Sequence, residues 1–262
     1  MGLIYRMKRL TKKFLGHEDY VRIKKDGAYC YDGLFTYHNH DFMKEPSFEK
    51  SYSYSVEKVG KDYQWYWRTH IGMTVALWAM NRGGAFAECG VGKGAMSTLV
   101  LKKLSLHYNK LPPFYLFDTF DGIDSSLVSQ EEEAFWGRSK GEVARNNKEE
   151  FGSSMDEVYA RYSSWPNVKI FKGSVPSVLI ENCGEIVKNR FSFLHIDMNN
   201  ATPEAAAVDF FIDKLTSPAF FLFDDYAYNG YTFQKYKIDE IAKKYGFHIA
   251  SLPTGQGLAI VG

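Results

Sequence analysis

The sequence predicts an α/β protein with a doubly wound, mostly parallel β-sheet. Short apolar runs recur along the chain between segments of helical character, as is typical of strands that helices bury on both faces. The first such run, "AFAEC", leads through "GVGKG" into the helix-forming "AMSTLV", the strand–turn–helix order that holds nucleotide-like ligands. With 262 residues the chain is long enough for one such domain with additional segments.

The expected elements follow in order along the chain. A helix is expected over Tyr63–Met80 and ends at the turn "NRGG". We expect strands at Ala85–Cys89, Phe114–Phe117, Val168–Phe171, Phe191–Ile196, Phe220–Phe223, His248–Leu252 and Leu258–Val261. The helices expected between them are Ser97–His107, Pro203–Leu215 and Phe233–Tyr245. The last two strands, joined by "PTGQG", are expected to form an antiparallel hairpin at the sheet edge.

Two segments do not follow this alternation. Residues 1–60 are aromatic and basic and form an N-terminal extension, in which "YCYDGLFTYHNHDF" reads as turns and short strands. Its first fifteen residues predict an ordinary surface helix, with a basic amphipathic helix that touches anionic lipid or a lipid-linked substrate as the alternative. Residues 123–165 are polar and charged. Because this insertion follows the second strand at the ligand-binding edge, we expect it to be a lid.

Charge and cysteine content exclude several classes of protein. Lys and Arg number 32 against 31 Asp and Glu, so no net field attracts nucleic acid. The three cysteines lack the paired spacing of zinc or redox sites and are expected to be reduced. No apolar run approaches the ~20 residues of a membrane span, and the start lacks the features of a secretory signal. We therefore expect a cytoplasmic protein without a nucleic-acid partner or a membrane span.

The glycine turn points to a cofactor with an adenosine part. Gly90, Gly92 and Ala95 fit the dinucleotide fingerprint, so a nicotinamide-dependent oxidoreductase is one alternative. Glu88 stands directly before the glycines, and a carboxylate there suits the cationic sulfonium and ammonium groups of S-adenosylmethionine. Asp118 ends the next strand and can accept both ribose hydroxyls of either cofactor. A tight turn that binds no ligand is the remaining alternative.

Three further acids follow two later strands. Asp197 ends "FSFLHI", and Asp224 and Asp225 end "FFLF". Strands linked by one right-handed crossover commonly lie side by side, about 4.8 Å apart, so these carboxylates are expected to converge. An all-oxygen set of this kind favours a hard cation such as Mg²⁺; helix capping or pairing with surface lysines is the alternative.

Two histidine features are ambiguous. His195 shares the face of Asp197 and is either an active-site base or a core histidine. The "HNH" at 38–40 is expected to be a turn rather than a metal site, because no second cluster stands at ligand spacing.

Several motifs in sequence resemble the macrocin O-methyltransferase family, bacterial enzymes that methylate sugar hydroxyls with S-adenosylmethionine and Mg²⁺. These motifs are "AECGVGKGA", "LFDTFDGI", "VKIFKGSVPSVL", "FLHIDMNNATPE", "FLFDDYAYNG" and "LPTGQGLAIV". The resemblance implies a class I methyltransferase (Rossmann-like) domain over 61–262. It also implies Glu88, Gly90 and Gly94 at the methionine part of the cofactor, Asp118 with Thr119 at the ribose, Gly173 and Ser174 near the adenine, and Asp197, Asp224 and Asp225 as metal ligands.

One motif departs from that family. Where members commonly read Asp-x-Asp-Leu-Tyr-Glu-Pro, this chain reads "DMNNATP", so that Asn199, Ala201 and Thr202 replace an acid, a tyrosine and a glutamate. The departure predicts another sugar, another class of small-molecule acceptor, or a cofactor-binding protein without catalysis. For a methyltransferase, Asp197 is the first choice of base and His195 the second. A homo-oligomer is among the expected assemblies.

Overall fold

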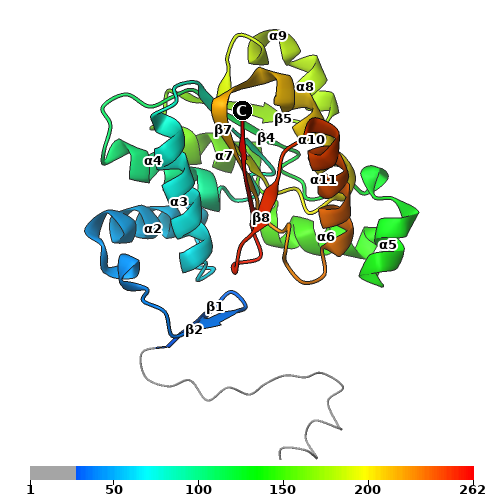
Figure 1. The fold of residues 1–262 in the computed structure, drawn as a ribbon, viewed down its shortest axis with the longest axis horizontal. Helices are drawn as coiled ribbons and strands as arrows, with labels where there is room; N and C mark the ends of the chain where they lie inside the picture. Colours follow the sequence, from blue (N-terminus) through cyan, green and yellow to red (C-terminus); the bar gives the residue numbers. More distant parts are fainter. Residues whose placement is uncertain (1–27) are drawn as a thin grey trace, which may run out of the picture.

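The computed structural model describes residues 28–262, and seven of their strands form one sheet (Figure 1). In spatial order the strands are β5, β4, β3, β6, β7, β9 and β8. The first five are parallel, whereas β9 is antiparallel to both β7 and β8. Their bounds are β3 (Ala85–Cys89), β4 (Phe114–Asp118), β5 (Val168–Lys172), β6 (Phe191–Ile196), β7 (Leu215–Phe223), β8 (Ile249–Ser251) and β9 (Gly257–Val261). The doubly wound sheet and its antiparallel edge hairpin are thus confirmed.

Helices cover both faces of this sheet (Figure 1). One apolar cluster joins the strands to α3 (Tyr66–Met80), α4 (Ala95–Ser105) and α7 (Met155–Tyr162). The other cluster joins the strands to α8 (Ser177–Glu181), α9 (Cys183–Ile186), α10 (Ala201–Phe211) and α11 (Thr232–Tyr245). The short helix η3 (Ile212–Lys214) directly follows α10. Successive strand residues alternate between the clusters: Phe86 belongs to the first and Ala87 to the second. This two-sided burial explains why the strands read as continuous apolar runs.

The described part of the N-terminal segment contains a hairpin and a helix. β1 (Tyr29–Tyr31) and β2 (Leu34–Thr36) pair antiparallel, and η1 (Asp41–Lys44) follows the "HNH" stretch. The expected short strands and turn are therefore found. Helix α2 (Pro46–Val59) was not predicted; proline at its start and Gly60 in the left-handed conformation at its end delimit it. It packs on α4, where Ser55 donates to the carbonyl of Ala95 at 2.8 Å. The expected helix over residues 1–15 lies outside the described residues.

The insertion 123–165 is helical, which its polarity did not indicate. It contains η2 (Ser125–Leu127), α5 (Gln130–Trp136), α6 (Lys140–Phe151) and α7. Each α-helix starts at a serine whose hydroxyl accepts the backbone N–H of a glutamate three residues on, in the pairs Ser129/Glu132, Ser139/Glu142 and Ser154/Glu157. This repeated S-x-x-E pattern is a helix-start signal that the sequence does contain.

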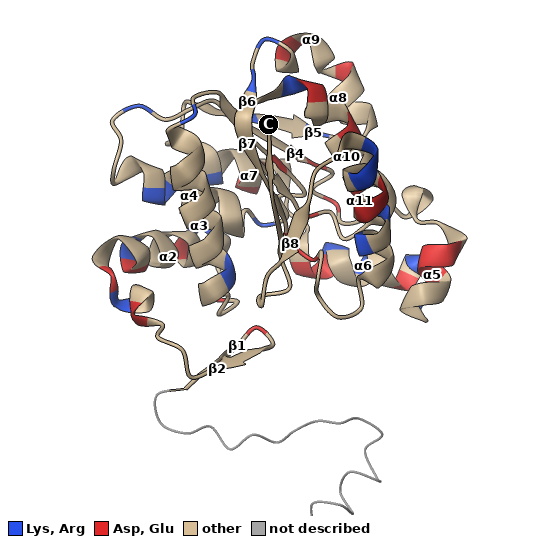
Figure 2. Cartoon of the chain, in the orientation of Figure 1, with Lys and Arg blue, Asp and Glu red and all other residues tan. Residues whose placement is uncertain are grey.

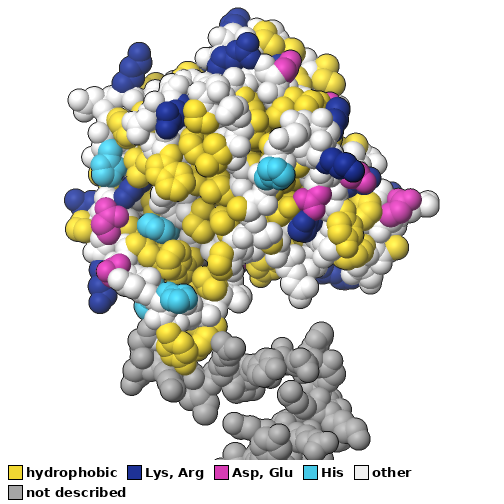
Figure 3. Space-filling model, viewed as in Figure 1, with side chains coloured by type: hydrophobic (Ala, Val, Ile, Leu, Met, Phe, Trp, Pro, Cys, Tyr) yellow, Lys and Arg dark blue, Asp and Glu magenta, His cyan; other side chains and the backbone are white. Residues whose placement is uncertain are grey.

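The surface mixes both signs of charge with apolar side chains. Lys, Arg, Asp and Glu are interspersed over the helices (Figure 2), and apolar side chains gather across the middle of the face in Figure 3. Trp78 of α3 is 49 % exposed and Ile260 of β9 is 57 % exposed. Within residues 28–262, no helix combines the length and apolarity needed to cross a membrane.

Candidate active site

A cavity of about 270 Å³ opens where β3, β4, β6 and β7 end. This is the point where the strand order reverses, since β3 lies between β4 and β6, and doubly wound sheets bind their ligands there. The glycine turn and the acids predicted from the sequence line one part of the cavity. Aromatic side chains line the cavity as well, namely Tyr63, Trp65, Tyr228 and Tyr231. The glycine turn and the acids predicted from separate strand ends therefore face one space.

Two glycines allow the turn after β3 to pass close to its neighbours. Gly90 has a φ of 87°, and a Cβ there would lie 1.8 Å from the carbonyl oxygen of Asp197. Gly94 has a φ of 76°, and a Cβ there would lie 2.2 Å from the hydroxyl oxygen of Tyr162. Both positions exclude side chains on conformational and steric grounds. The absence of side chains brings the turn directly against the end of β6.

Asp118 supports the glycine turn as well as lining the cavity. Its Oδ2 accepts the N–H groups of Val91 and Gly92, the latter at 2.8 Å, and its Oδ1 accepts the N–H of Phe120. Burial raises the pKa of this carboxyl, although the backbone donors act in the opposite direction. The sequence did not indicate this bond to the turn. Thr119, Gly173 and Ser174 line the same end of the cavity.

Replacing Asp118 with alanine is expected to weaken S-adenosylhomocysteine binding by about 1.5–3 kcal/mol, because charge-assisted hydrogen bonds to the turn and the ribose are lost. Isothermal calorimetry measures the change. Asp121→Ala is the matched control, since Asp121 is exposed and pairs with Lys148. Equal affinities of the Asp118→Ala protein and wild type would remove Asp118 from the binding site.

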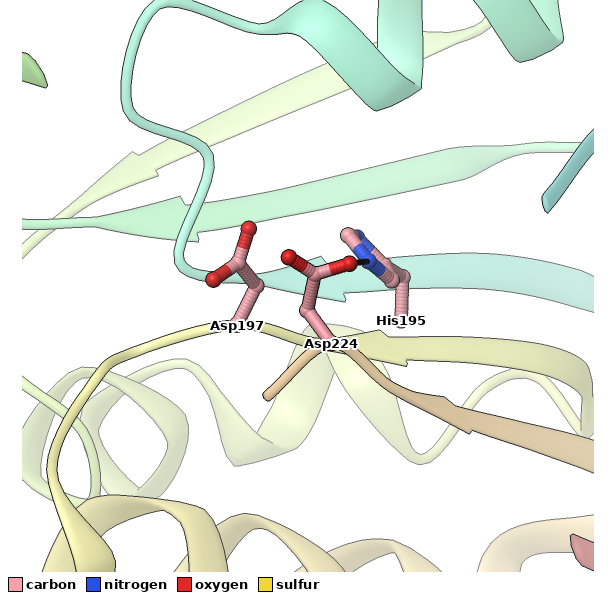
Figure 4. Close-up of side chains that lie close together, drawn as sticks. All are labelled: His195, Asp197 and Asp224. Carbon is pink, nitrogen blue, oxygen red and sulfur yellow. Dashed lines mark ion pairs between the residues drawn. The ribbon is translucent and has the colours of Figure 1, made fainter. Parts of the chain in front are cut away.

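Glu88 and His195 form a buried pair at the centre of the sheet edge. Both are 1 % exposed, and Glu88 Oε1 lies 2.8 Å from His195 Nδ1. The other carboxylate oxygen, Oε2, has no hydrogen-bond partner within the described part of the chain. On its far side, His195 Nε2 lies 3.5 Å from Asp224 Oδ1 (Figure 4). The imidazole thus lies between two carboxylates.

This position determines the charge of His195. Burial alone would lower the imidazole pKa, but Asp224 and Glu88 outweigh that effect and raise the pKa to about 10. Near neutral pH the ring is therefore a cation. In that state it can neither accept a proton nor coordinate a metal through nitrogen.

We expect ¹⁵N NMR of histidine-labelled protein to show one imidazole that stays protonated up to about pH 9, with a midpoint near 10. Its folded-state pKa exceeds the unfolded value of about 6.5. The stabilisation is therefore complete below pH 6 and is lost as the pH rises through 10. A His195→Gln variant assigns the resonance. A His195 midpoint below 7 would contradict the assigned charge.

The acids that follow β6 and β7 converge in part. Ligand atoms of His195, Asp197 and Asp224 all lie within 4.8 Å of one another (Figure 4). No donor among residues 28–262 makes a hydrogen bond to the Asp197 side chain, and burial together with Asp224 raises its pKa well above the ordinary value. Asp225 is turned toward Arg68, with 3.4 Å between Oδ1 and Nη1. The structure thus brings Asp197 and Asp224 together, while Asp225 faces a cation.

Arg68 is the site residue that the sequence analysis missed. It lies on α3, is 3 % exposed and pairs with Asp224 through Nη1. Asp224 in turn accepts the Gln256 amide at 3.1 Å. Although burial raises the pKa of Asp224, Arg68 and His195 outweigh it and hold that pKa below its usual range. Burial and Asp224 raise the pKa of Asp225 to about 7. A lone arginine within the apolar "YWRTHIG" is the signal that could have identified Arg68.

Carboxylates outnumber cations in this cluster. The acids are Asp32, Glu88, Asp197, Asp224 and Asp225, and the cations that contact them are Arg68 and His195. An excess of buried carboxylates attracts additional positive charge. The cavity is therefore suited to a cationic ligand.

Comparison with known proteins defines the fold class. No protein-family model matches the sequence, and no curated protein is significantly similar to it. The solved structure of the O-methyltransferase NovP is 15 % identical and has a TM-score of 0.58 over 74 % of this chain and 79 % of its own. That of CalS11, the calicheamicin methyltransferase, is 15 % identical with a TM-score of 0.57 over 90 % and 98 %. At this identity the likeness shows the fold, which is the class I methyltransferase fold.

Proposed function

We propose that this protein transfers a methyl group from S-adenosylmethionine to a hydroxyl of a sugar or related small molecule, with Mg²⁺ bound in the site. The observation that carries the proposal is the unpartnered, buried oxygen of Glu88 beside a glycine turn in a cavity rich in carboxylates. S-adenosylmethionine is cationic at its sulfonium and ammonium groups, which suit a cavity rich in carboxylates. The nicotinamide alternative gives the carboxylate cluster no role. The macrocin-type motifs and the fold shared with NovP and CalS11 support the same choice.

The chain's own residues suit each part of this donor. Glu88, Gly90 and Gly94 would hold the methionine part, since Glu88 supplies a free carboxylate oxygen and the glycine turn that follows it lines the same cavity. Asp118 and Thr119 would hold the ribose, with Gly173 and Ser174 at the adenine. Phe151 packs 3.3 Å from where a Cβ of Gly92 would lie. The insertion that carries Phe151 therefore forms a wall of the donor site, consistent with the lid prediction.

The donor set also fits a hard divalent cation. Asp197 offers a carboxylate that receives no hydrogen bond from the described residues, and Asp224 lies beside it. Asp197, Asp224 and Asp225 would hold Mg²⁺, with Asp225 shared with Arg68. The ion would supply charge stabilisation to the acceptor oxygen.

Proton transfer is assigned to Asp197. Its carboxylate receives no hydrogen bond from the described residues and is open to the hydroxyl proton, whereas the His195 ring is enclosed between Glu88 and Asp224 and Asn199 is an amide. The acceptor oxygen loses its proton to Asp197 and forms a bond to the methyl carbon, while the carbon–sulfur bond breaks and leaves a neutral thioether. His195 and Arg68 hold the neighbouring carboxylates in place.

Donor binding and donor turnover test the proposal. In thermal shift, S-adenosylhomocysteine is expected to stabilise the protein and NAD(H) is expected to have no effect. A turnover screen of nucleotide sugars, glycan precursors and simple polyols, with and without Mg²⁺, then identifies the acceptor. Stabilisation by NAD(H) alone would support the oxidoreductase. Donor binding without turnover of any acceptor would support a cofactor-binding protein without catalysis.

Self-association is part of the same proposal. Trp78 of α3 and Ile260 of β9 expose apolar surface beside Phe220 of β7, which contacts Trp78 and pairs with Ile260, and exposed apolar surface is typical of contacts between copies. Light scattering of the purified protein measures the mass.

A further inference from the structure

The β1–β2 hairpin reaches the active site through one buried ion pair. Asp32, with a φ of 50°, lies in the turn between β1 and β2. Its Oδ2 accepts a hydrogen bond from Arg68 Nε at 2.9 Å. The two side chains are 9 % and 4 % exposed. The hairpin lies beyond the start of α3 (Figure 1), where Tyr29 and Asp32 contact Trp67 and Arg68, so this pair connects a peripheral element to the carboxyl edge of the sheet.

The same guanidinium holds the two acids that follow β7. Nη1 donates to the Asp224 backbone carbonyl at 2.9 Å, pairs with the Asp224 carboxylate and lies 3.4 Å from Asp225 Oδ1. Nη2 donates to the carbonyl of Thr254 at 3.1 Å. The flat faces of Arg68 lie near the rings of Trp65 and Tyr228, at 5.8 and 5.4 Å from the ring centroids. Each edge of the guanidinium thus has a different partner.

These contacts require arginine. The guanidinium is planar and its donors diverge in fixed directions, whereas lysine presents one compact ammonium on a flexible stem. A lysine at position 68 would keep the charge but could not bond Asp32 and Asp224 on separate edges while also reaching Thr254.

We propose that Arg68 is a positioning residue: anchored by Asp32, it fixes the orientation of Asp224 and Asp225 and ties the β1–β2 hairpin to the cavity, which Asp32 lines. The positioning of Asp224 and Asp225 rests on the proposed function, because that proposal assigns both acids to the metal. The attachment of the hairpin through Asp32 does not depend on the proposed function.

Metal binding tests the first part without turnover. Mn²⁺ is titrated alone, by electron paramagnetic resonance, into wild type, Arg68→Lys, Asp32→Asn and Asp32→Glu. We expect Arg68→Lys and Asp32→Asn to lower Mn²⁺ affinity by roughly 10–100-fold, the usual effect of removing a residue that orients a metal ligand. Asp32→Glu is expected to recover much of the loss, because it restores a carboxylate. Asp121→Asn, a surface carboxylate paired with Lys148, is the control for charge alone.

A spin label tests the hairpin. Cys30 in β1 is exposed and Cys89 is buried, so a nitroxide can be attached at Cys30 in a Cys183→Ser background. Asp32→Asn is expected to raise the mobility of the label, whereas Asp121→Asn is expected to leave it unchanged. Circular dichroism confirms that each variant is folded.

The two readouts separate the inference from the proposed function. Unchanged label mobility in Asp32→Asn would overturn the tie between hairpin and site. Unchanged Mn²⁺ affinity in Arg68→Lys and in Asp32→Asn would overturn the positioning role. A wild-type protein that binds neither Mn²⁺ nor S-adenosylhomocysteine would instead refute the proposed function, and the label would still decide whether Asp32 holds the hairpin.

Discussion

Asparagine in place of Asp197 is expected to lower kcat by about 10²–10⁴-fold, the usual contribution of a positioned base. The substitution keeps the shape of the side chain but removes its ability to accept the hydroxyl proton, and no neighbouring group takes over. His195 is protonated between Glu88 and Asp224, and Asn199 is an amide. Binding of the donor is expected to persist, because other residues hold it.

Single-turnover methyl transfer to the best acceptor from the screen measures this effect, and calorimetry with S-adenosylhomocysteine measures binding. Asp121→Asn serves again as the surface control. A kcat within about threefold of wild type for Asp197→Asn would show that another group accepts the proton.

Asp224→Asn is expected to lower the free energy of unfolding by about 3–5 kcal/mol, because it leaves buried charges without their partner. Asp224 contacts Arg68, His195 and the Gln256 amide. Asp225 makes one long contact with Arg68, and burial together with Asp224 raises its pKa to about 7. The matched change Asp225→Asn is therefore expected to cost less, because Arg68 keeps its contacts with Asp224 and Asp32.

Urea unfolding of the three proteins at pH 8 measures these differences, and Mn²⁺ titration is expected to show weaker binding for both variants. Equal destabilisation by the two substitutions would refute the distinct roles given to the neighbouring acids. Unaltered Mn²⁺ affinity in both would show that these carboxylates do not hold the ion.

The sequence predicted the central sheet well because local pattern and burial agree there. Phe191–Ile196 is apolar except for Ser192 and His195 and is buried on both faces, so it reads as the short, near-continuous apolar run of a covered parallel strand. The polar helices α5 to α7 were missed because composition was given more weight than their serine caps. The unpredicted helix α2 has only three buried residues, Phe48, Ser51 and Ser55. With two serines among them, no apolar stripe marked the helix.

The sequence predicted the site residues that stand at the ends of strands. Glu88, Asp118, Asp197 and Asp224 line one cavity because parallel strands end at one edge. The pairing of Arg68 with Asp32 was not predictable, since it joins residues 36 positions apart in sequence and depends on how α3 and the hairpin dock. The charge of His195 likewise depends on carboxylates from two other strands.

The insertion 123–165 and the hairpin at 29–36 differ in how easily another sequence could replace them in an engineered chimera. The insertion 123–165 reaches the donor turn through Phe151 at Gly92 and Tyr162 at Gly94, and Glu132 accepts the N–H of Ala201 at the start of α10. Grafting another sequence there would disrupt the donor half of the site. The hairpin at 29–36 joins the body through the Tyr29 hydroxyl, which accepts the N–H of Trp67, and through Asp32. Among the hairpin residues Asp32 is the one that lines the cavity, so a library that varies the rest of the hairpin around a retained Asp32 would leave the cavity lining unchanged.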